Sequence, residues 1–198
     1  MLKQLVVATN NAHKLDEIRG LLGRDWRVLG AGDVAPGVTW EETGLTFLEN
    51  ARIKITALRP FTTGPILADD SGLCVDALDG RPGVFSSSFG GVEGDHGKNV
   101  THLLQEMLGA PSGSRGAHFY CLLLYSQALG EEASFEGRCH GHISTFRRGA
   151  GGFGYDPVFL VGASGVSMAE MSPEGKNAVS HRGLAMRDFV KSCLLHKS

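Results

Sequence analysis

Long hydrophobic runs are missing from this sequence of 198 residues. Its uncharged apolar segments, such as YCLLLY at residues 120–125, are much shorter than the roughly 20 residues of a membrane-spanning helix. Only one lysine and a few apolar residues precede Thr9, which is not typical of a signal peptide. We therefore expect a cytoplasmic protein that does not act at a membrane.

A strong excess of charge of either sign is also missing. The chain has 19 basic and 21 acidic side chains, a net charge of −2, which argues against a protein that binds nucleic acid polymers. Cysteine is scarce as well: the four cysteines form no CxxC pair, so we expect reduced thiols rather than a disulfide framework.

The apolar pattern, by contrast, is that of an ordinary globular protein, and hydrophobic residues make up 42% of the chain. Segments typical of strands, such as residues 4–8 and 118–126, alternate with amphipathic helical segments. This alternation predicts an α/β fold, and the absence of a linker or repeat predicts one domain over residues 1–198.

Several helix boundaries can be predicted. Thr9 to Asn11 are good N-cap types for a helix with Leu15 and Ile18 on its apolar face, and the loop after this helix contains Gly30. Thr46 and Glu49 have capping-box spacing, and Pro60 ends the helix that follows them. Further helices are predicted around residues 100–108, after the Ser172-Pro173 N-cap, and around residues 184–194.

Strands are predicted at residues 133–146 and 156–161 as well. The segment PILADDSGL, residues 65–73, predicts a strand that ends in two carboxylates, followed by a Ser-Gly turn. The next residues, LCVDAL, are expected to return as a paired strand.

The first candidate site is TNNAHK, residues 9–14, between a strand and a helix N-terminus. Free backbone N–H groups and the helix dipole favour an anion there. Lys14 in the first helical turn opposes the dipole unless an anion such as phosphate is bound. The alternative is a capped helix with a solvated lysine.

The second candidate is a group of four acidic residues: Glu41, Glu42, Asp69 and Asp70. Adjacent aspartates at the end of an apolar strand are unusual because like charges repel and burial is unfavourable. Mg²⁺ resolves both problems, since it binds through one or two carboxylates together with substrate phosphates. A remaining carboxylate can then act as a general base. The alternative, a plain turn, explains Asp70-Ser71-Gly72 but not Asp69.

Two further segments provide groups that suit a flat base. Phe153 and Tyr155, flanked by glycines, can stack on a ring, and Lys176, His181 and Arg182 cluster as donors for a carbonyl group. The alternatives are a glycine-rich turn with core aromatics and a solvated basic helix start.

Three other sites are not supported by their context. Gly149, Gly151 and Gly154 match G-x-G-x-x-G, but no helix follows, so a dinucleotide site is rejected. The segment Cys139-His140-Gly141-His142 lacks a second ligand pair for structural zinc. A serine hydrolase using Ser71 lacks the G-x-S-x-G elbow.

Taken together, the segments TNNAHK, EETGLTFLENARIK, ADDSGL, GRPGVFSS, GGFGYDPVF and SHRG resemble the inosine triphosphate pyrophosphatase family, in the family's order and over nearly the whole chain. The resemblance implies an elongated, two-lobed fold with a long twisted mixed sheet and a central substrate cleft, in a homodimer. It also implies Mg²⁺-dependent hydrolysis of ITP, dITP and XTP to the monophosphate and pyrophosphate, which cleanses the nucleotide pool.

The resemblance also implies roles for individual residues. Phosphate contacts are implied for Thr9, Asn10, Asn11, Ala12, His13, Lys14 and Lys54. The metal site is implied for Glu42, with Glu41 beside it, and for Asp69 and Asp70, with Asp70 also the general base. Substrate, base and sugar contacts are implied for Ser71, Phe153, Gly154, Tyr155, Asp156, Lys176, His181 and Arg182.

The sequence departs from the family pattern at Ser88, where the family commonly has an arginine, so no role of that arginine carries over. Asn10 replaces a frequent glycine, and Gly175 replaces a better helix former. An alternative function is a nucleotide-binding sensor without turnover, and a terminal phosphatase is a third. The pair Asp69-Asp70 argues against the sensor.

Overall fold

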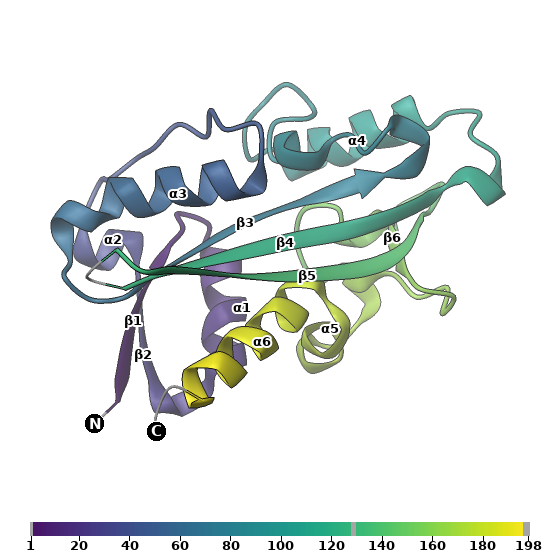
Figure 1. Cartoon of the computed structure of the whole chain (residues 1–198). Helices are drawn as coiled ribbons and strands as arrows, with labels where there is room; N and C mark the ends of the chain where they lie inside the picture. The colour runs from purple at the N-terminus through teal and green to yellow at the C-terminus, as the bar shows by residue number, and fades with distance from the viewer. Residues whose placement is uncertain (1, 128–129, 196–198) are drawn as a thin grey trace. The chain divides into compact units, whose positions relative to one another are not determined.

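Six strands form one open, mixed sheet in the order β2-β1-β3-β4-β5-β6 (Figure 1). β1 pairs in parallel with β2 and with β3, whereas β5 and β6 are antiparallel. This computed structural model describes residues 2–127 and 130–195. The predicted α/β class is confirmed. The strands are β1 Lys3–Ala8, β2 Trp26–Gly30, β3 Ile66–Val75, β4 Gly116–Ser126, β5 Glu132–Ile143 and β6 Phe159–Val161.

The chain divides into two compact units, each with its own hydrophobic core. Unit 1 consists of Met1–Asp70, Cys121–Gly137 and Arg182–Ser198, and unit 2 of Ser71–Tyr120 and Arg138–His181. The boundaries fall within β3, β4 and β5, so each of these strands contributes to both units. That the chain is one domain stays a prediction.

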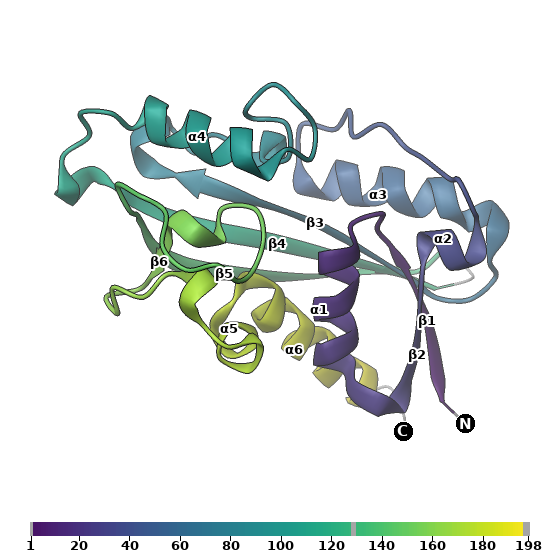
Figure 2. The same cartoon turned by 180° about the vertical axis from the view of Figure 1, so that it is seen from behind.

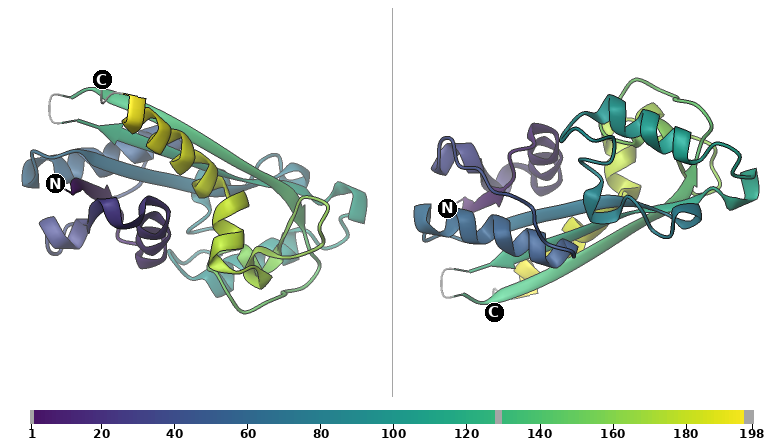
Figure 3. Two further views of the ribbon diagram at one scale, coloured as in Figure 1. Left: turned by 90° about the horizontal axis from the view of Figure 1, so that it is seen from below. Right: turned by 90° about the horizontal axis from the view of Figure 1, so that it is seen from above.

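In unit 1, helices cover both faces of the strands. α1 (Ala12–Leu22) and α6 (His181–Leu195) lie on one face, and α3 (Phe47–Leu58) lies on the other (Figure 2). Figure 3 shows α6 running along β4 and β5 on the side away from α3. The core under α1 and α6 includes Leu5, Val7, Ile18, Leu67, Leu123 and Phe189.

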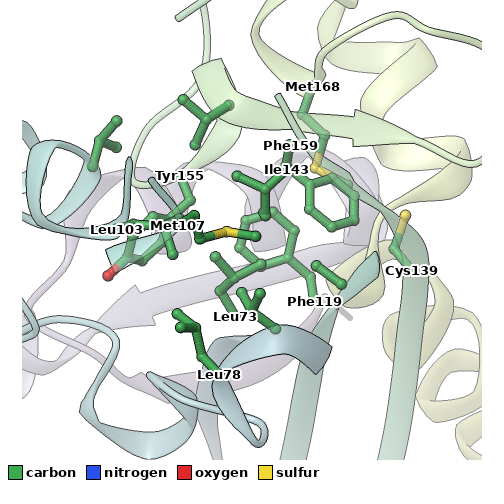
Figure 4. Packing of buried hydrophobic residues seen from close by; sticks show 14 residues of the cluster. Leu73, Leu78, Leu103, Met107, Phe119, Cys139, Ile143, Tyr155, Phe159 and Met168 are labelled. Atoms are coloured by element: carbon green, nitrogen blue, oxygen red, sulfur yellow. The ribbon is translucent and has the colours of Figure 1, made fainter. Parts of the chain in front are cut away.

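In unit 2, one core joins residues of β3, β4 and β5 to α4 (His96–Glu106) and to the segment around β6. The members of this core include Leu73, Leu103, Met107, Phe119, Phe159 and Met168 (Figure 4). α5 (Pro173–Val179) follows later in the chain.

No helix in residues 2–127 and 130–195 has both the length and the apolarity that a bilayer crossing demands.

The predicted helix starts are confirmed by their caps. The Thr46 hydroxyl oxygen accepts a hydrogen bond from Glu49 N at 3.2 Å, and Glu49 Oε2 accepts one from Thr46 N at 3.0 Å, which is a capping box. Ser172 caps α5 in the same way, by accepting from Gly175 N at 3.1 Å, with proline in the first turn.

The predicted Ser-Gly turn after Asp70 is wrong, because β3 continues through Ser71 and Gly72 to Val75. A Cβ atom on Gly72 would lie 2.1 Å from the carbonyl oxygen of Gly83. Glycine is therefore required by the close approach of another backbone segment, not by a turn. The expected return strand in LCVDAL is also wrong, since Asp76–Leu78 form a 3₁₀ turn.

Two short elements lie where the sequence predicted a loop. β2 pairs with β1 from Lys3 opposite Trp26 to Val7 opposite Gly30, and α2 (Ala31–Val34) follows it directly. β2 has only five residues with an irregular burial pattern, so hydrophobic periodicity gives little signal for it.

Candidate active site

The segment TNNAHK joins β1 to α1, as predicted. Thr9 Oγ1 accepts a hydrogen bond from Asn11 N at 3.1 Å, and Asn11 Oδ1 accepts one from Lys14 N at 3.2 Å, which caps α1. Asn10 Nδ2 donates to the Val38 carbonyl oxygen at 3.2 Å. The loop is thus held by its own polar side chains.

Parallel pairing of β1 with β3 brings this loop to the two aspartates. Ala8 lies opposite Ala68 in the register, so Thr9, the first residue after β1, lies beside Asp69 within β3. Ala12 and His13, in the first turn of α1, have exposed side chains. The helix start and the carboxylates therefore belong to one group in unit 1.

Asp69 is fully buried between two cations. Lys14 Nζ lies 2.8 Å from its Oδ1, and Arg182 Nε donates to its Oδ2 at 2.6 Å. Cys121 Sγ adds a weak hydrogen bond to Oδ2 at 3.4 Å. Burial by itself raises the pKa of Asp69, but the charges of Arg182 and Lys14 outweigh it and hold this pKa well below its usual value. Asp69 is therefore ionised at neutral pH.

Arg182 has a second anionic partner. Its Nη1 donates to Glu17 Oε2 on α1, and 1% of the arginine side chain is exposed. Burial opposes its charge, but Asp69 and Glu17 outweigh burial and raise the pKa of Arg182. Lys14, Glu17, Asp69 and Arg182 thus form a network of two positive and two negative charges, in which Asp69 and Arg182 are buried and Lys14 and Glu17 half-buried.

Asp70 lies beside a buried lysine. Lys54 Nζ, from α3, donates to Asp70 Oδ1 at 2.6 Å and to the Asp69 carbonyl oxygen at 3.0 Å. It also lies 3.1 Å from Glu42 Oε2. Burial disfavours the charge of Lys54, but Asp70 and Glu42 outweigh it and raise its pKa. Burial raises the pKa of Asp70 to about 6 in spite of Lys54.

The second oxygen of Asp70, Oδ2, is buried and has no hydrogen-bond partner among the residues that the structure describes. A buried carboxylate oxygen without a donor is unfavourable unless a cation or water binds it. Within the described chain, no group of three or more His, Cys, Asp or Glu side chains is arranged to hold a metal ion. Asp70 Oδ2 and the Glu42 carboxylate therefore suit a hard cation that takes its remaining ligands from water or phosphate. Glu41 is exposed.

A second group of predicted residues lies in unit 2. The Asp156 carboxylate is buried, accepts a hydrogen bond from Phe153 N at 2.8 Å, and forms an ion pair with Lys176 Nζ. Lys176 Nζ also lies 4.8 Å from the centroid of the Phe153 ring, within the range of a cation–π contact. A Cβ atom on Gly152 would lie 2.1 Å from Asp156 Oδ2, so the glycines let this loop wrap around Asp156.

The neighbours His181 and Arg182 point to different surroundings. The buried His181 ring stacks on Phe119, with centroids 4.7 Å apart and an angle of 11° between the planes. Arg182 binds Asp69 and Glu17, as described above. Ser71, next to Asp70 on β3, is half-buried, and Gly154 has a φ of 61°. That these residues contact a substrate stays a prediction.

Three contributing residues were not predicted: Glu17, Phe119 and Cys121. Glu17 lies three residues after Lys14 on α1, so helix spacing places both on one face and could have indicated it. Phe119 and Cys121 lie in β4, where their partners His181 and Asp69 are distant in sequence, and no local pattern marks them.

The chain resembles known proteins over nearly its full length. The Ham1 family model matches residues 5–192. A relative from Halalkalibacterium halodurans, named dITP/XTP pyrophosphatase, is 44% identical over 191 residues, which cover 96% of this chain and 98% of the relative. A protein of the same name from Geobacter sulfurreducens is 45% identical, over 92% of each chain.

Solved structures agree with the sequence relatives. A Ham1 protein from Coxiella burnetii superposes with a TM-score of 0.85 at 36% identity, and 100% of each chain is covered. The Ham1 protein of Staphylococcus aureus gives a TM-score of 0.84 at 34% identity, over 99% of this chain and 100% of that one.

Proposed function

This chain belongs to the Ham1 family, and we propose that it hydrolyses deaminated purine nucleoside triphosphates, namely ITP, dITP and XTP, to the monophosphate and pyrophosphate. The enzyme would thereby cleanse the nucleotide pool. The proposal rests on the Asp70 carboxylate beside Lys54 and Glu42. Lys54 binds its Oδ1, whereas its buried Oδ2 has no hydrogen-bond partner among the described residues. The names of the relatives from Halalkalibacterium and Geobacter support the substrate class.

We propose that the residues of the β1–α1 loop bind the triphosphate. The backbone N–H groups at the start of α1 favour an anion, and Lys14 and Lys54 add two positive charges. Lys14 remains 14% exposed while its Nζ pairs with the buried Asp69, which Arg182 holds in place. It can therefore reach a phosphate without losing its buried partner.

For the metal, Mg²⁺ is the ion that the chemistry of the donors favours. Asp70 and Glu42 would hold it, because both present carboxylate oxygens and Asp70 Oδ2 lacks any other partner in the described chain. When bound, the ion supplies charge neutralisation for the phosphates. Asp69, grouped with the metal ligands by the resemblance, already accepts from two cations. We propose that it positions Lys14.

The chemical step assigned to the chain's own residues is proton removal. Asp70 accepts the proton of the attacking water as a general base, and Lys54 orients its carboxylate for this task. Lys14 and Lys54 stabilise the negative charge that develops on the departing pyrophosphate.

Base selection is assigned to residues of unit 2. Phe153 provides a ring on which the purine can stack, and Lys176 and His181 provide donors for the 6-keto group. The amino group of adenine would leave these donors unpaired, which disfavours ATP. Arg182 shares this role in the family resemblance, but its contacts with Asp69 and Glu17 favour a positioning role instead.

The test is an incubation of purified protein and Mg²⁺ with ITP, XTP, dITP, GTP or ATP, in which pyrophosphate and orthophosphate are assayed separately. We expect pyrophosphate from ITP, XTP and dITP, little from ATP, and none from any nucleotide once EDTA is added. Release of orthophosphate would identify a terminal phosphatase. Binding of ITP without any product would identify a sensor.

We further propose a homodimer and a cytoplasmic location. The four cysteines are all free thiols, in keeping with a reducing compartment. Light scattering of the purified protein at several concentrations tests the dimer, which predicts a mass of twice 21.1 kDa.

A further inference from the structure

Tyr155 lies in the middle of the loop that carries Phe153 and Asp156, yet its side chain is buried. Its hydroxyl donates a hydrogen bond to the carbonyl oxygen of Ser86 at 2.9 Å. Burial raises the pKa of Tyr155, so the hydroxyl keeps its proton and remains a donor at neutral pH. The ring packs in the core of unit 2 with Leu73 and Phe159 (Figure 4).

Asp156, the residue after Tyr155, binds both Phe153 and Lys176 through one carboxylate oxygen. Phe153 N donates to Asp156 Oδ2 at 2.8 Å, and the same oxygen binds Lys176 Nζ. The loop from 153 to 156 and Lys176 therefore form one hydrogen-bonded assembly. A displacement of Tyr155 would move Phe153, Asp156 and Lys176 together.

Ser86, which accepts the hydrogen bond from Tyr155, is itself hydrogen-bonded to β3. Its Oγ accepts from Leu73 N at 2.9 Å and donates to the Gly83 carbonyl oxygen at 2.6 Å. Gly72 lets the turn at Gly83 approach the strand, since a Cβ there would lie 2.1 Å from the Gly83 oxygen. The turn thus has a fixed position against β3, directly after Ser71.

We propose that Tyr155 is a positioning residue that fixes the base-contacting loop to β3 through the Ser86 turn, and that this hydrogen bond sets base selectivity. The inference rests on the proposed function, because it assumes that Phe153, Asp156 and Lys176 contact the nucleoside. It gives Tyr155 a different role from the direct substrate contact that the family resemblance implies.

The expected effect on KM and kcat follows from the part of the site that the Tyr155–Ser86 hydrogen bond positions, which is the loop at residues 153–156. The ion pairs that orient Asp70, Lys54 and Lys14 are made within unit 1, so loss of the Tyr155 hydroxyl leaves these groups of the chemical step in place. A weaker hold on the base lowers substrate binding in ground and transition state alike, which raises KM and leaves kcat unchanged. Loss of donor alignment reduces discrimination between a keto and an amino group.

The experiment compares wild type with Tyr155→Phe, which removes the hydroxyl alone. We expect KM for ITP to rise about tenfold, kcat to stay within about twofold, and the ITP-to-ATP ratio of kcat/KM to fall about fivefold or more. Tyr120→Phe is the matched control, because Tyr120 lies in unit 2 and stacks with Arg138 instead. It should leave all three values unchanged.

A purely structural role for Tyr155 would lower the unfolding temperature without changing KM or selectivity, and that result would overturn the inference. Calorimetric titration with IMP separates this from a failure of the proposed function. If wild type binds IMP but releases no pyrophosphate, the proposed function fails. The inference then still requires Tyr155→Phe to bind IMP about tenfold more weakly.

Ser86→Ala provides a second, independent variant. It keeps the carbonyl oxygen that accepts from Tyr155 but removes the Oγ that holds the turn to β3. If Tyr155 acts through this turn, Ser86→Ala reduces selectivity as well, and the double variant is no worse than the more impaired single variant. Additive effects in the double variant would show that the two residues act separately, and the inference would be wrong.

Discussion

Asp70 and Lys54 form a buried ion pair through one oxygen of the Asp70 carboxylate. Lys54 Nζ donates to Asp70 Oδ1 at 2.6 Å, whereas the buried Oδ2 has no hydrogen-bond partner in the part of the chain that the structure describes. A lysine that holds one oxygen and leaves the other available is suited to both tasks proposed for Asp70. One oxygen is oriented, and the other can bind a cation or take a proton.

The first prediction concerns the charge of Asp70. Asp70→Asn keeps the shape of the side chain but removes the base, and we expect kcat to fall by about 10²–10⁴. Circular dichroism should show an unchanged fold. A folded variant with near-normal release of pyrophosphate would contradict the role of Asp70 as the base.

The second prediction concerns the two adjacent glutamates. Both glutamates are exposed, but Glu42 Oε2 lies 3.1 Å from Nζ of the buried Lys54, which also binds Asp70. Glu42→Gln should raise the Mg²⁺ concentration that gives half-maximal activity by about tenfold, since one carboxylate ligand is lost. Glu41→Gln is the matched control and should change this concentration little. A larger increase of this concentration in Glu41→Gln than in Glu42→Gln would assign the metal ligand to Glu41 instead.

The third prediction is a pH dependence of metal binding. Burial raises the pKa of Asp70 from 3.8 to about 6, so the folded chain holds this proton more tightly than the unfolded chain does. This contribution to stability is complete below pH 3.8 and is lost as the pH rises through 6. Mg²⁺ requires the ionised carboxylate.

The increase in unfolding temperature caused by Mg²⁺ should therefore grow from pH 5 to pH 7. The measurement is a thermal unfolding series with and without Mg²⁺ at each pH. An increase of the same size at pH 5 and at pH 7 would contradict the assignment of Asp70 as a ligand.

The fourth prediction separates the neighbours His181 and Arg182. His181→Ala should reduce the preference for ITP over ATP while the protein remains folded. Arg182→Met should destabilise the protein by about 3–5 kcal/mol, because it leaves Asp69 buried with one cation fewer. Chemical denaturation measures the free energy of unfolding of both variants. A stable Arg182→Met variant with a changed preference between ITP and ATP would instead support a direct contact of Arg182 with the base.

The fifth prediction concerns Glu17, the outer partner of Arg182. Glu17→Gln should cost about 1–3 kcal/mol in the free energy of unfolding, since the buried guanidinium loses one of its counter-charges. Asp16→Asn is the control on the same helix. Asp16 is 73% exposed and lies 3.5 Å from Arg19, so its loss should change stability by less than about 0.5 kcal/mol. Equal effects of the two variants would exclude a special role for Glu17.

Features that depend on a few adjacent residues could be predicted from the sequence. The capping box of Thr46 and Glu49 and the N-cap at Ser172 are local, and the helices begin where these patterns indicated. The Ser71-Gly72 pair was misread because its glycine serves a close approach to Gly83, which is a tertiary contact. That the β1–α1 loop lies beside Asp69 follows from the parallel pairing of β1 with β3, which the sequence does not show.

The electrostatic arrangement of the site could not be predicted in the same way. The pairing of Arg182 with Asp69 joins residues 113 positions apart, and the sequence alone suggested that Arg182 would read the base. Nor does the sequence show that Lys54 is buried between Asp70 and Glu42, since burial depends on the packing of α3 against the sheet.

The four thiols offer a way to follow the opening of each unit separately. Unit 1 contains the fully buried Cys121 and the half-buried Cys193, and unit 2 contains the buried Cys139 and the half-buried Cys74. Burial raises the pKa of all four thiols, that of Cys121 far above its usual value and that of Cys139 to about 11, which suppresses the reactive thiolate. Cys74 and Cys193 are only half-buried and should be alkylated faster than Cys121 and Cys139. The slow alkylation rate of Cys121 would then measure the transient exposure of the core of unit 1, and that of Cys139 the exposure of the core of unit 2.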